Sequence, residues 1–412
     1  MAKLPLEISG LNISIDHLIP GGQGIATTPE LAQAEVTSLS DSAKAIIAPG
    51  KKAFFWNALP GEIVTDFKIT KSKSHYFEAI AIKIKQPSAH RVVPKDSCFL
   101  ATSPWQIMDY DYELEQKHAL LVEQFAQQGI KISPASVQTD KNDYFYRNKM
   151  EYSLYWDITE SKIKLAQHER GSHRKVPLTT SSIERPEIFQ AASKIIDDLN
   201  ARGEEARKYQ SLLLRADQSG HVEGGLYENK KPHPVFNNLT DKILGQQYSY
   251  SPNGFFQINL PVYEMALQKI KQEISSKNVL DLYSGVGTIG LSVARDKNLT
   301  LVECNRFAYS ELEKNAAGIG RTVLSNSEDA LEYIEPDQTV IVDPPRAGCD
   351  KKLIDKFLEV LPETIIYLSC NPATQARDVK LLIKKYEISS VTPFNFFPRT
   401  PHLENLVILK KR

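Results

Sequence analysis

A regular alternation of strand and helix patterns in the C-terminal part of the chain constrains the fold more than any other feature. From about Pro261 onward, short apolar runs are separated by helix-type segments, and the five strand candidates are NVLDLYS, LTLVECN, RTVLSN, QTVIVDP and TIIYLSC. Strands that alternate with helices in this way form a parallel, doubly wound α/β sheet. Two later pieces, YEISSVTPFNFF and LENLVILKK, are expected to close one edge of this sheet in antiparallel pairing.

The N-terminal part shows a different pattern. Short alternating segments such as LEISGLNISIDHLI and KAFFWNAL are separated by turns that contain Gly and Pro, which predicts a small β-barrel in residues 1–70. KSKSHYFEAIAIKIKQ is expected to form a further strand outside that barrel, and a helix is predicted from about Asp111 to Gln128. IFQAASKIIDDLNARG is a second helix candidate. We therefore expect three domains, residues 1–70, 71–245 and 246–412.

The composition excludes several classes of protein. No run approaches the roughly 18 apolar residues that a membrane-spanning helix needs. The four cysteines are scattered without a CxxC pair, which argues against a disulfide framework or a structural zinc site and predicts a cytoplasmic protein. The formal net charge of zero neither supports nor excludes a nucleic-acid partner.

A glycine-rich segment follows the first strand of the predicted sheet. DLYSGVGTIG contains a literal G-x-G-x-x-G pattern at Gly285, Gly287 and Gly290, and such glycines let a ligand approach the backbone at a helix N-terminus. Glu303 ends the second strand, where a carboxylate can accept hydrogen bonds from ribose hydroxyls. Alone, this pattern fits a nicotinamide dinucleotide, S-adenosylmethionine, or a tight turn beside an exposed glutamate.

The segment IVDPPRAG favours one of these cofactors. Asp343 ends the fourth strand, and ligands of open α/β sheets bind outside the carboxyl ends of the strands. Asp343 is therefore predicted to face the same crevice as Gly285 and Glu303. A dehydrogenase does not need Asp-Pro-Pro at this position, whereas methyltransferases that act on nucleobases commonly hold the base with such a loop. A rigid surface turn is the plain alternative.

A cysteine, Cys370, follows the fifth strand in YLSCNPATQARD. A lone cysteine usually acts as a small buried apolar side chain. At the carboxyl end of a strand and beside a helix N-terminus, however, its thiolate form is favoured. We therefore predict that Cys370 is a nucleophile in the crevice, a setting that the other three cysteines lack.

Together these motifs resemble those of the S-adenosylmethionine-dependent RNA uracil-C5 methyltransferases, which make 5-methyluridine. FFQIN, DLYSGVGTIGL, VDPPRAG, LSCNPATQARD and FPRTPHLENL follow the order of the family, and YRNKMEY is similar to its central-domain motif. The resemblance covers nearly the whole chain. It implies a C-terminal Rossmann-like class I methyltransferase sheet, an N-terminal OB-type β-barrel similar to the TRAM domain, and a central α+β domain that binds RNA.

The resemblance also implies a role for each site residue. Cys370 would add to C6 of uracil and make C5 nucleophilic, and Glu404 would remove the C5 proton so that the thiolate can leave. Without its flanking motif, Glu404 would be taken for an ordinary exposed glutamate. Asp343 would hold the uracil edge or the cofactor end of the crevice. The residues expected to bind S-adenosylmethionine are Gln257, Tyr283, Gly285, Thr288, Glu303, Asp329 and Asp343.

The RNA partner is expected to meet basic and aromatic side chains. The target base must be extruded from folded RNA, and the candidates for phosphate contacts are Arg147, Lys149, Arg170, His173, Arg174 and Lys175, with a solvated face as the alternative. Phe54, Phe55 and Trp56 are either stacking platforms or core residues. The TRAM-like barrel favours 23S ribosomal RNA over tRNA as the substrate. The enzyme is expected to be a monomer.

One feature departs from the family pattern. Many members bind an iron–sulfur cluster through three cysteines before a Trp-Gln pair and a fourth further on. Here the pair is Trp105-Gln106, and the aligned positions hold Pro94, Leu100, Ser103 and Ser181. Because Cys98 alone cannot hold a cluster that needs four thiolates, we predict no cluster and no other metal.

Other functions stay open on the sequence alone. An NAD-linked oxidoreductase would use the glycine pattern but would leave Cys370, Asp343 and Glu404 without roles. An RNA-binding chaperone with an inactive methyltransferase domain would not need these three residues intact. A cytosine-C5 methyltransferase uses similar thiolate chemistry, but places its cysteine in a different local sequence.

Overall fold

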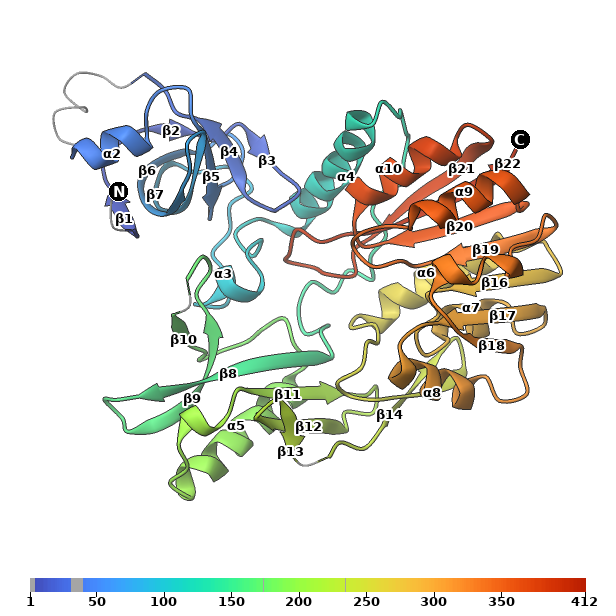
Figure 1. Cartoon of the computed structure of the whole chain (residues 1–412). Coiled ribbons are helices and arrows are strands. Elements are labelled where there is room, and N and C mark those ends of the chain that lie inside the picture. Colours follow the sequence, from blue (N-terminus) through green and yellow to red (C-terminus); the bar gives the residue numbers. More distant parts are fainter. Residues whose placement is uncertain (1–3, 31–39, 173, 234) are drawn as a thin grey trace. The chain divides into compact units, whose positions relative to one another are not determined.

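The computed structural model describes residues 4–30, 40–172, 174–233 and 235–412 (Figure 1). The chain divides into two compact units, which are described separately. The first comprises the described parts of Met1–Gln116 together with Ser153–Ser182 and Arg399–Pro401. The second comprises Lys117–Tyr152, Ile183–Pro398 and His402–Arg412. The three-domain division drawn from the sequence stays a prediction.

The first unit contains an N-terminal sheet of seven strands. These are β1 (Leu6–Ile8), β2 (Ile13–Ser14), β3 (His17–Leu18), β4 (Gly24–Thr27), β5 (Lys52–Trp56), β6 (Ile63–Ser72) and β7 (Tyr76–Gln86). Side chains alternate along β5, so that Phe55 is fully buried while Phe54 and Trp56 stay partly exposed on the other face. Phe55 is therefore a core residue and not a stacking platform. The OB-type barrel stays a prediction.

The strand β7 belongs to this sheet, so the prediction that residues 71–86 form a strand outside it is wrong. β7 pairs in parallel with β5 and antiparallel with β6. Its buried side chains, Phe77, Ala79 and Ala81, pack in the same core as Phe55 and Phe67. Residues 71–75 contain the end of β6 and the tight connection from β6 to β7. The short helix α2 (Asp41–Ile46), capped by Ser40, was not predicted.

Each unit contains part of the long strand β8 (Lys149–Asp157). In the first unit, its end pairs with β9 (Lys162–His168), which pairs with β10 (Lys175–Pro177). In the second unit, its start pairs with β11 (Ser211–Ala216), which is followed by β12 (Val222–Glu228) and β13 (Lys231–His233).

Two predicted helices are confirmed. The helix α4 (Tyr110–Gln127) agrees with the predicted 111–128 helix. The helix α5 (Pro186–Ala201) begins at a proline, which suits the first helical turn. Its residues Ile188, Ala192, Ile196 and Leu199 are buried at helical spacing, and α5 packs on β11 and β12. Short helical turns α3 (Phe99–Thr102) and η1 (Ala206–Lys208) connect neighbouring elements.

The C-terminal sheet of the second unit has the predicted parallel strands. They are β16 (Asn278–Leu282), β17 (Asn298–Glu303), β18 (Arg321–Leu324), β19 (Gln338–Val342) and β20 (Thr364–Ser369). The strands β21 (Tyr386–Phe394) and β22 (Glu404–Lys411) close one edge antiparallel. The order β18-β17-β16-β19-β20-β22-β21 can be followed in Figure 1, and it confirms the predicted α/β sheet with its antiparallel edge.

Helices and a hairpin accompany this sheet. The helices are α6 (Leu260–Gln272), α7 (Thr288–Val293), α8 (Arg306–Asn315), α9 (Lys351–Val360) and α10 (Pro372–Leu382), with turns η2 (Ser327–Asp329) and η3 (Leu331–Tyr333). The hairpin pairs β14 (Leu239–Ile243) with β15 (Gln246–Tyr250). Every residue of β19 and β20 is buried, as expected for strands covered on both faces.

The order of the strands reverses beside β16. From β16 the chain moves outward through β17 to β18, and it then returns to β19 on the other side. Such a switch point opens a crevice at the carboxyl ends of the two central strands. None of the helices in the described part of the chain is both long enough and apolar enough to span a membrane.

Candidate active site

A cavity of about 1770 Å³ lies in the second unit at the carboxyl ends of the parallel strands. The segments that follow β16, β17, β18, β19 and β20 all contribute to its wall. The segment 251–257 and the start of β22 complete it. The crevice predicted from the strand pattern is therefore present, and it gathers residues from widely separated parts of the chain.

The glycine-rich loop and Glu303 form one side of the cavity. The backbone N–H of Gly285 donates to Oε2 of Glu303 at 2.8 Å, and the N–H of Asn305 donates to Oε1 at 2.6 Å. A Cβ atom on Gly285 would meet nothing within 4 Å, so the loop is open on that side. Tyr283 has a positive φ of 62°, which is uncommon outside glycine. The loop thus fixes the Glu303 carboxylate at the cavity wall.

A second carboxylate, Asp281, lies buried behind this loop. Its Oδ2 accepts a hydrogen bond from the N–H of Gly290 at 2.8 Å. Burial raises the pKa of Asp281 to about 7, and the charges of Asp343 and Glu303 add to that effect. A Cβ on Gly290 would lie 2.8 Å from the same oxygen, so the glycine is needed for this contact. No role was predicted for Asp281, although it is the first residue of the glycine-rich segment DLYSGVGTIG.

The thiol of Cys370 is partly buried in the cavity wall among charged groups. Burial, together with the charges of Glu404 and Asp343, raises the pKa of Cys370 to about 11, while Arg346 opposes them. The prediction that the strand end and the following helix favour the thiolate is therefore wrong for this protein. Burial of the thiol is the largest cause of this shift, and the charges of the two carboxylates add to it.

The carboxylates of Glu404 and Asp343 lie in the same part of the cavity. Glu404 begins β22 and is 5% exposed, which rules out the alternative that Glu404 is an ordinary exposed glutamate. Burial, together with the charge of Asp343, raises the pKa of Glu404 well above its ordinary value. Burial raises the pKa of Asp343 to about 7. Both groups therefore hold a proton at a higher pH than a solvated carboxylate does.

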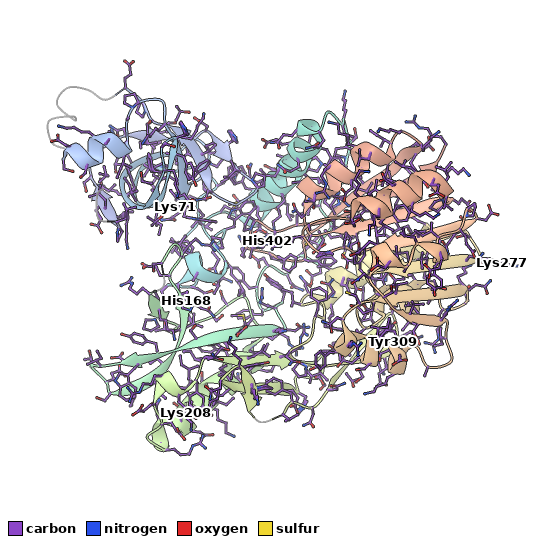
Figure 2. All side chains as sticks on the ribbon, viewed as in Figure 1. Lys71, His168, Lys208, Lys277, Tyr309 and His402 are labelled. Carbon is purple, nitrogen blue, oxygen red and sulfur yellow. The ribbon has the colours of Figure 1, made fainter. Side chains whose placement is uncertain are left out.

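Most residues expected to bind the cofactor line this cavity, but Asp329 does not. Gln257, Tyr283 and Thr288 belong to the wall, and the hydroxyl oxygen of Thr288 lies 2.8 Å from that of Tyr263. Asp329 is exposed and its carboxylate accepts a hydrogen bond from Asn326. His402, labelled in Figure 2, also lines the cavity two positions before Glu404.

The predicted phosphate contacts differ in their surroundings. Arg147 lines the cavity. The ammonium group of Lys149 donates to the carbonyls of Asn253 and Gly254, both at 3.1 Å, and burial lowers its pKa to about 8. Lys149 therefore holds the cavity segment 251–257. Within the first unit, Arg174 pairs with Glu169 at 2.9 Å.

Two further basic candidates, Arg170 and Lys175, also have structural partners. In the first unit, the guanidinium of Arg170 lies 4.0 Å from the ring centroid of Trp56, and Lys175 donates to the carbonyl of Leu154. His173 lies outside the described residues. Arg215, which the sequence did not single out, is fully buried and donates to the carbonyl of Phe256. These contacts show that several basic side chains hold the backbone.

Polar side chains surround the positions that correspond to the cluster ligands. Nε2 of Gln106 donates to Oγ of Ser103 at 2.6 Å and to Oδ2 of Asp96 at 2.7 Å. The same Asp96 oxygen accepts a hydrogen bond from the hydroxyl of Ser182 at 2.7 Å. Within the described ranges, no three His, Cys, Asp or Glu side chains are arranged to hold a metal ion. A hydrogen-bonded network therefore occupies this region.

Comparison with known proteins identifies what the chain is similar to. The family described as tRNA (uracil-5-)-methyltransferase matches residues 329–412. An uncharacterised RNA methyltransferase of Prochlorococcus marinus is 30% identical over 419 residues, which cover 86% of this chain and 99% of the relative. Another from Bacillus cereus is 27% identical over 87% of this chain and 92% of the relative.

A solved structure shares the fold. It is the crystal structure of the Pyrococcus abyssi tRNA (uracil-54, C5)-methyltransferase in complex with S-adenosyl-L-homocysteine. The match has a TM-score of 0.73 and covers 97% of this chain and 100% of that one, at 22% sequence identity. The shared fold therefore extends over almost the whole chain, including the N-terminal sheet.

Replacing Glu404 by glutamine should lower the pKa of Cys370, because one of the two charges that oppose its thiolate is removed. Alkylation of Cys370 by iodoacetamide, followed over a series of pH values by peptide mass spectrometry, should then begin at lower pH in Glu404→Gln. Glu311→Gln is the matched control, since Glu311 also lines the cavity but does not affect Cys370. Identical profiles for wild type and Glu404→Gln would contradict this electrostatic account.

Proposed function

Because the chain belongs to the family of S-adenosylmethionine-dependent RNA (uracil-5-)-methyltransferases, we propose that it methylates C5 of a uridine in RNA through a covalent bond from Cys370 to C6. The observation that carries this proposal is the convergence of Cys370, Glu404 and Asp343 on the cavity that also contains the glycine-rich loop. A thiol and buried carboxylates are the groups that this reaction needs.

The cavity wall fits S-adenosylmethionine. The Glu303 carboxylate, held by two backbone N–H groups, is placed to accept hydrogen bonds from both ribose hydroxyls. The open side of Gly285 leaves room for the ligand next to the loop. We assign cofactor contacts to the wall residues Gln257, Tyr283, Gly285, Thr288, Glu303 and Asp343. When bound, S-adenosylmethionine supplies an electrophilic methyl group on its sulfonium.

The first role of the protein is to activate C5, which is too weak a nucleophile to react unaided. The thiolate of Cys370 forms a bond to C6, and the electrons of the C5–C6 double bond move into an enolate with a nucleophilic C5. The guanidinium of Arg346 favours the thiolate. Asp343 is proposed to hold the edge of the uracil ring, since a protonated carboxyl group can donate to a carbonyl oxygen.

The second role is to release the methylated base. After methyl transfer, C5 carries both the new methyl group and its original proton. The carboxylate of Glu404 removes that proton, the C5–C6 double bond forms again, and the C6–S bond breaks to return the thiolate. The raised pKa of Glu404 makes its carboxylate a stronger base than a solvated glutamate. Glu404 then loses the proton to solvent.

The RNA substrate has two candidates. The sequence favoured 23S ribosomal RNA because of the N-terminal barrel. The Pyrococcus abyssi enzyme, however, is a tRNA methyltransferase whose fold matches 97% of this chain, so the N-terminal sheet is compatible with tRNA as well. We keep 23S ribosomal RNA as the first candidate and a tRNA uridine as the second. Loss of 5-methyluridine from one of these RNAs in a deletion strain identifies the substrate.

Glu303 is expected to contribute to cofactor affinity. Glu303→Ala should weaken S-adenosylmethionine binding by about 1.5–3 kcal/mol, the range for hydrogen bonds to a charged group. Isothermal titration calorimetry without RNA measures this effect. Glu311→Ala serves as the control, because Glu311 is equally buried and lines the same cavity. Equal affinities for Glu303→Ala and wild type would remove Glu303 from the cofactor site.

Two variants should distinguish the activation of C5 by Cys370 from the release of the methylated base by Glu404. Cys370→Ala should abolish both methylation and any covalent protein–RNA adduct, while S-adenosylmethionine still binds. Glu404→Gln should form the methylated adduct and then retain it, because elimination cannot proceed while the C5 proton remains. Denaturing gels with methyl-labelled S-adenosylmethionine would show labelled RNA that migrates with the protein.

Three results would contradict this mechanism. Methylation by Cys370→Ala would exclude the covalent step, and normal turnover by Glu404→Gln would show that another base acts. A wild-type protein that binds RNA but methylates neither candidate would instead support the RNA-binding chaperone with an inactive methyltransferase domain.

A further inference from the structure

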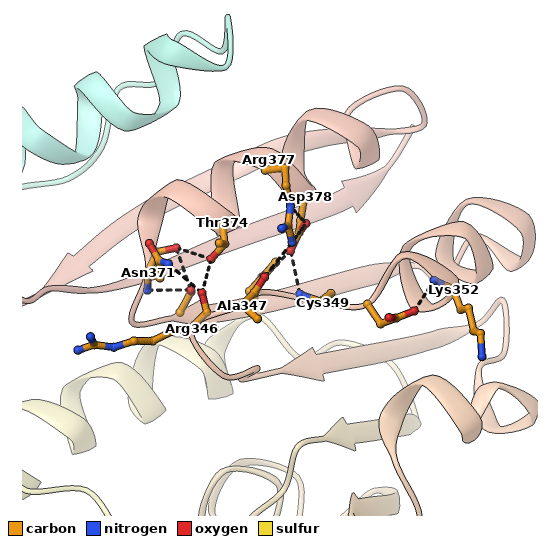
Figure 3. Close-up of polar contacts among 11 residues, drawn as sticks. Arg346, Ala347, Cys349, Lys352, Asn371, Thr374, Arg377 and Asp378 are labelled. Atoms are coloured by element: carbon orange, nitrogen blue, oxygen red, sulfur yellow. Dashed lines mark hydrogen bonds and ion pairs between the residues drawn. The ribbon is translucent and has the colours of Figure 1, made fainter. Parts of the chain in front are cut away.

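Asp378 is a buried carboxylate of α10 that the proposed reaction does not use. Its side chain is 1% exposed. Oδ2 accepts hydrogen bonds from the backbone N–H of Cys349 at 2.9 Å and from the hydroxyl of Tyr367 at 2.8 Å. Oδ1 accepts from Nε of Arg377 at 2.9 Å. One carboxylate therefore joins the loop after β19, the strand β20 and the helix α10. Figure 3 shows its contacts with Cys349 and Arg377.

Other side chains of α10 and its cap hold the preceding part of the same loop. The side-chain amide of Asn371 donates to the carbonyl of Arg346 at 2.8 Å, and the hydroxyl of Thr374 donates to the same oxygen at 3.1 Å. Nη2 of Arg377 donates to the carbonyl of Ala347 at 3.0 Å. The backbone of residues 346–349 is thus held at three of its four residues by side chains of one helix and its cap (Figure 3).

The remaining residue of this loop, Gly348, allows the close approach. Its φ is +81°, and a Cβ atom there would lie 2.6 Å from Oδ2 of Asp378 and 2.7 Å from Nη2 of Arg377. A side chain at this position would therefore displace the carboxylate from the N–H of Cys349. Because Gly348 has no side chain, the carboxylate of Asp378 can lie close to the backbone of the loop.

The loop held in this way carries the cation that faces the nucleophile. The charged groups that act on Cys370 are Glu404 from β22, Asp343 from the end of β19 and Arg346 from the loop itself. Only Arg346 favours the thiolate among them. Because charge–charge interactions in a partly buried site depend strongly on distance, the position of residues 346–349 affects how readily Cys370 ionises.

We propose that Asp378 is a positioning residue, which fixes residues 346–349 against α10 and thereby keeps the guanidinium of Arg346 beside the Cys370 sulfur. This assignment rests on the proposed role of Cys370 as nucleophile. Asp378 does not touch the substrate in this account. Asp378 acts through Arg346. Replacing Asp378 should therefore no longer change the ionisation of Cys370 once Arg346 has been replaced by a neutral residue.

The alternative is a purely structural role, in which Asp378 only satisfies the buried donors of Tyr367 and Cys349. Loss of a buried hydrogen-bond network destabilises a protein wherever it lies. Such a loss would lower stability without changing the ionisation of one particular cysteine. The ionisation of Cys370 therefore distinguishes the two accounts, whereas stability or activity alone does not.

The test measures alkylation of Cys370 by iodoacetamide as a function of pH, without RNA, in the full-length protein. Asp378→Asn should move the profile to higher pH and slow alkylation at a fixed pH by about tenfold, because the thiolate is the reactive form. Arg346→Gln should produce a similar shift. The double variant should match Arg346→Gln alone, since Asp378 acts through that residue.

A pair of tyrosines provides a matched comparison if Asp378→Asn does not fold. Tyr367→Phe removes a donor to Asp378, and Tyr386→Phe removes the donor to the carbonyl of Pro362 at 2.9 Å in the same sheet. Both hydroxyls are buried. Tyr367→Phe should shift the Cys370 profile in the same direction as Asp378→Asn, but by less, and Tyr386→Phe should leave it unchanged.

Specific outcomes would overturn the proposal. A folded Asp378→Asn protein with the wild-type profile would exclude it, and so would a double variant whose shift exceeds that of Arg346→Gln. Equal profiles for the two tyrosine variants would exclude it as well. Since alkylation needs neither RNA nor methyl transfer, these results are independent of the methylation assays. Failure of methylation with the expected alkylation profiles would refute the proposed function alone.

Discussion

The parallel pairing of β16, β19 and β20 is the constraint on which the site depends. Leu282 lies opposite Val342, and Val342 lies opposite Tyr367, so the segments that follow these strands leave the sheet at one edge. Nearly all side chains of these strands are buried, so the polar groups that line the cavity lie where the strands end. The glycine-rich loop, Asp343 and Cys370 therefore meet although they are far apart in the chain.

The site also depends on the balance of charges in the cavity at this edge of the sheet. Burial weakens the solvation of each charge, so a thiolate and two carboxylates in one cavity oppose one another. Burial is the largest cause of the raised pKa values of Cys370, Glu404 and Asp343, and neighbouring charges add to it at Cys370 and Glu404. Arg346 is the cation that opposes this trend at the sulfur. The hydrogen bonds from Asp378 and Arg377 to residues 346–349 lie within the cavity wall, and they therefore bear on the chemistry.

Basic side chains in this protein often act within the fold. The ammonium group of Lys149 and the guanidinium of Arg215 both bind carbonyls of the segment 251–257, which contributes to the cavity wall. Buried cations of this kind remain charged partners of backbone oxygens and shape a loop from within. A count of basic residues in the sequence does not separate them from exposed cations that could meet phosphate groups. Arg147 lines the cavity and also donates to the carbonyl of Lys149 at 2.8 Å, and its contact with RNA stays a prediction.

The sequence by itself determined the parallel sheet, its antiparallel edge and the crevice that contains Gly285, Glu303, Asp343 and Cys370. These follow from local periodicity and from the rule that ligands bind at the carboxyl ends of parallel strands. Only the tertiary structure decided that β7 joins the N-terminal sheet, since the sequence pattern of a strand does not specify the strands with which it pairs. It also decided the ionisation of Cys370 and the role of Asp378. Both depend on distances between groups brought together from separate strands, and local sequence patterns contain no information on those distances.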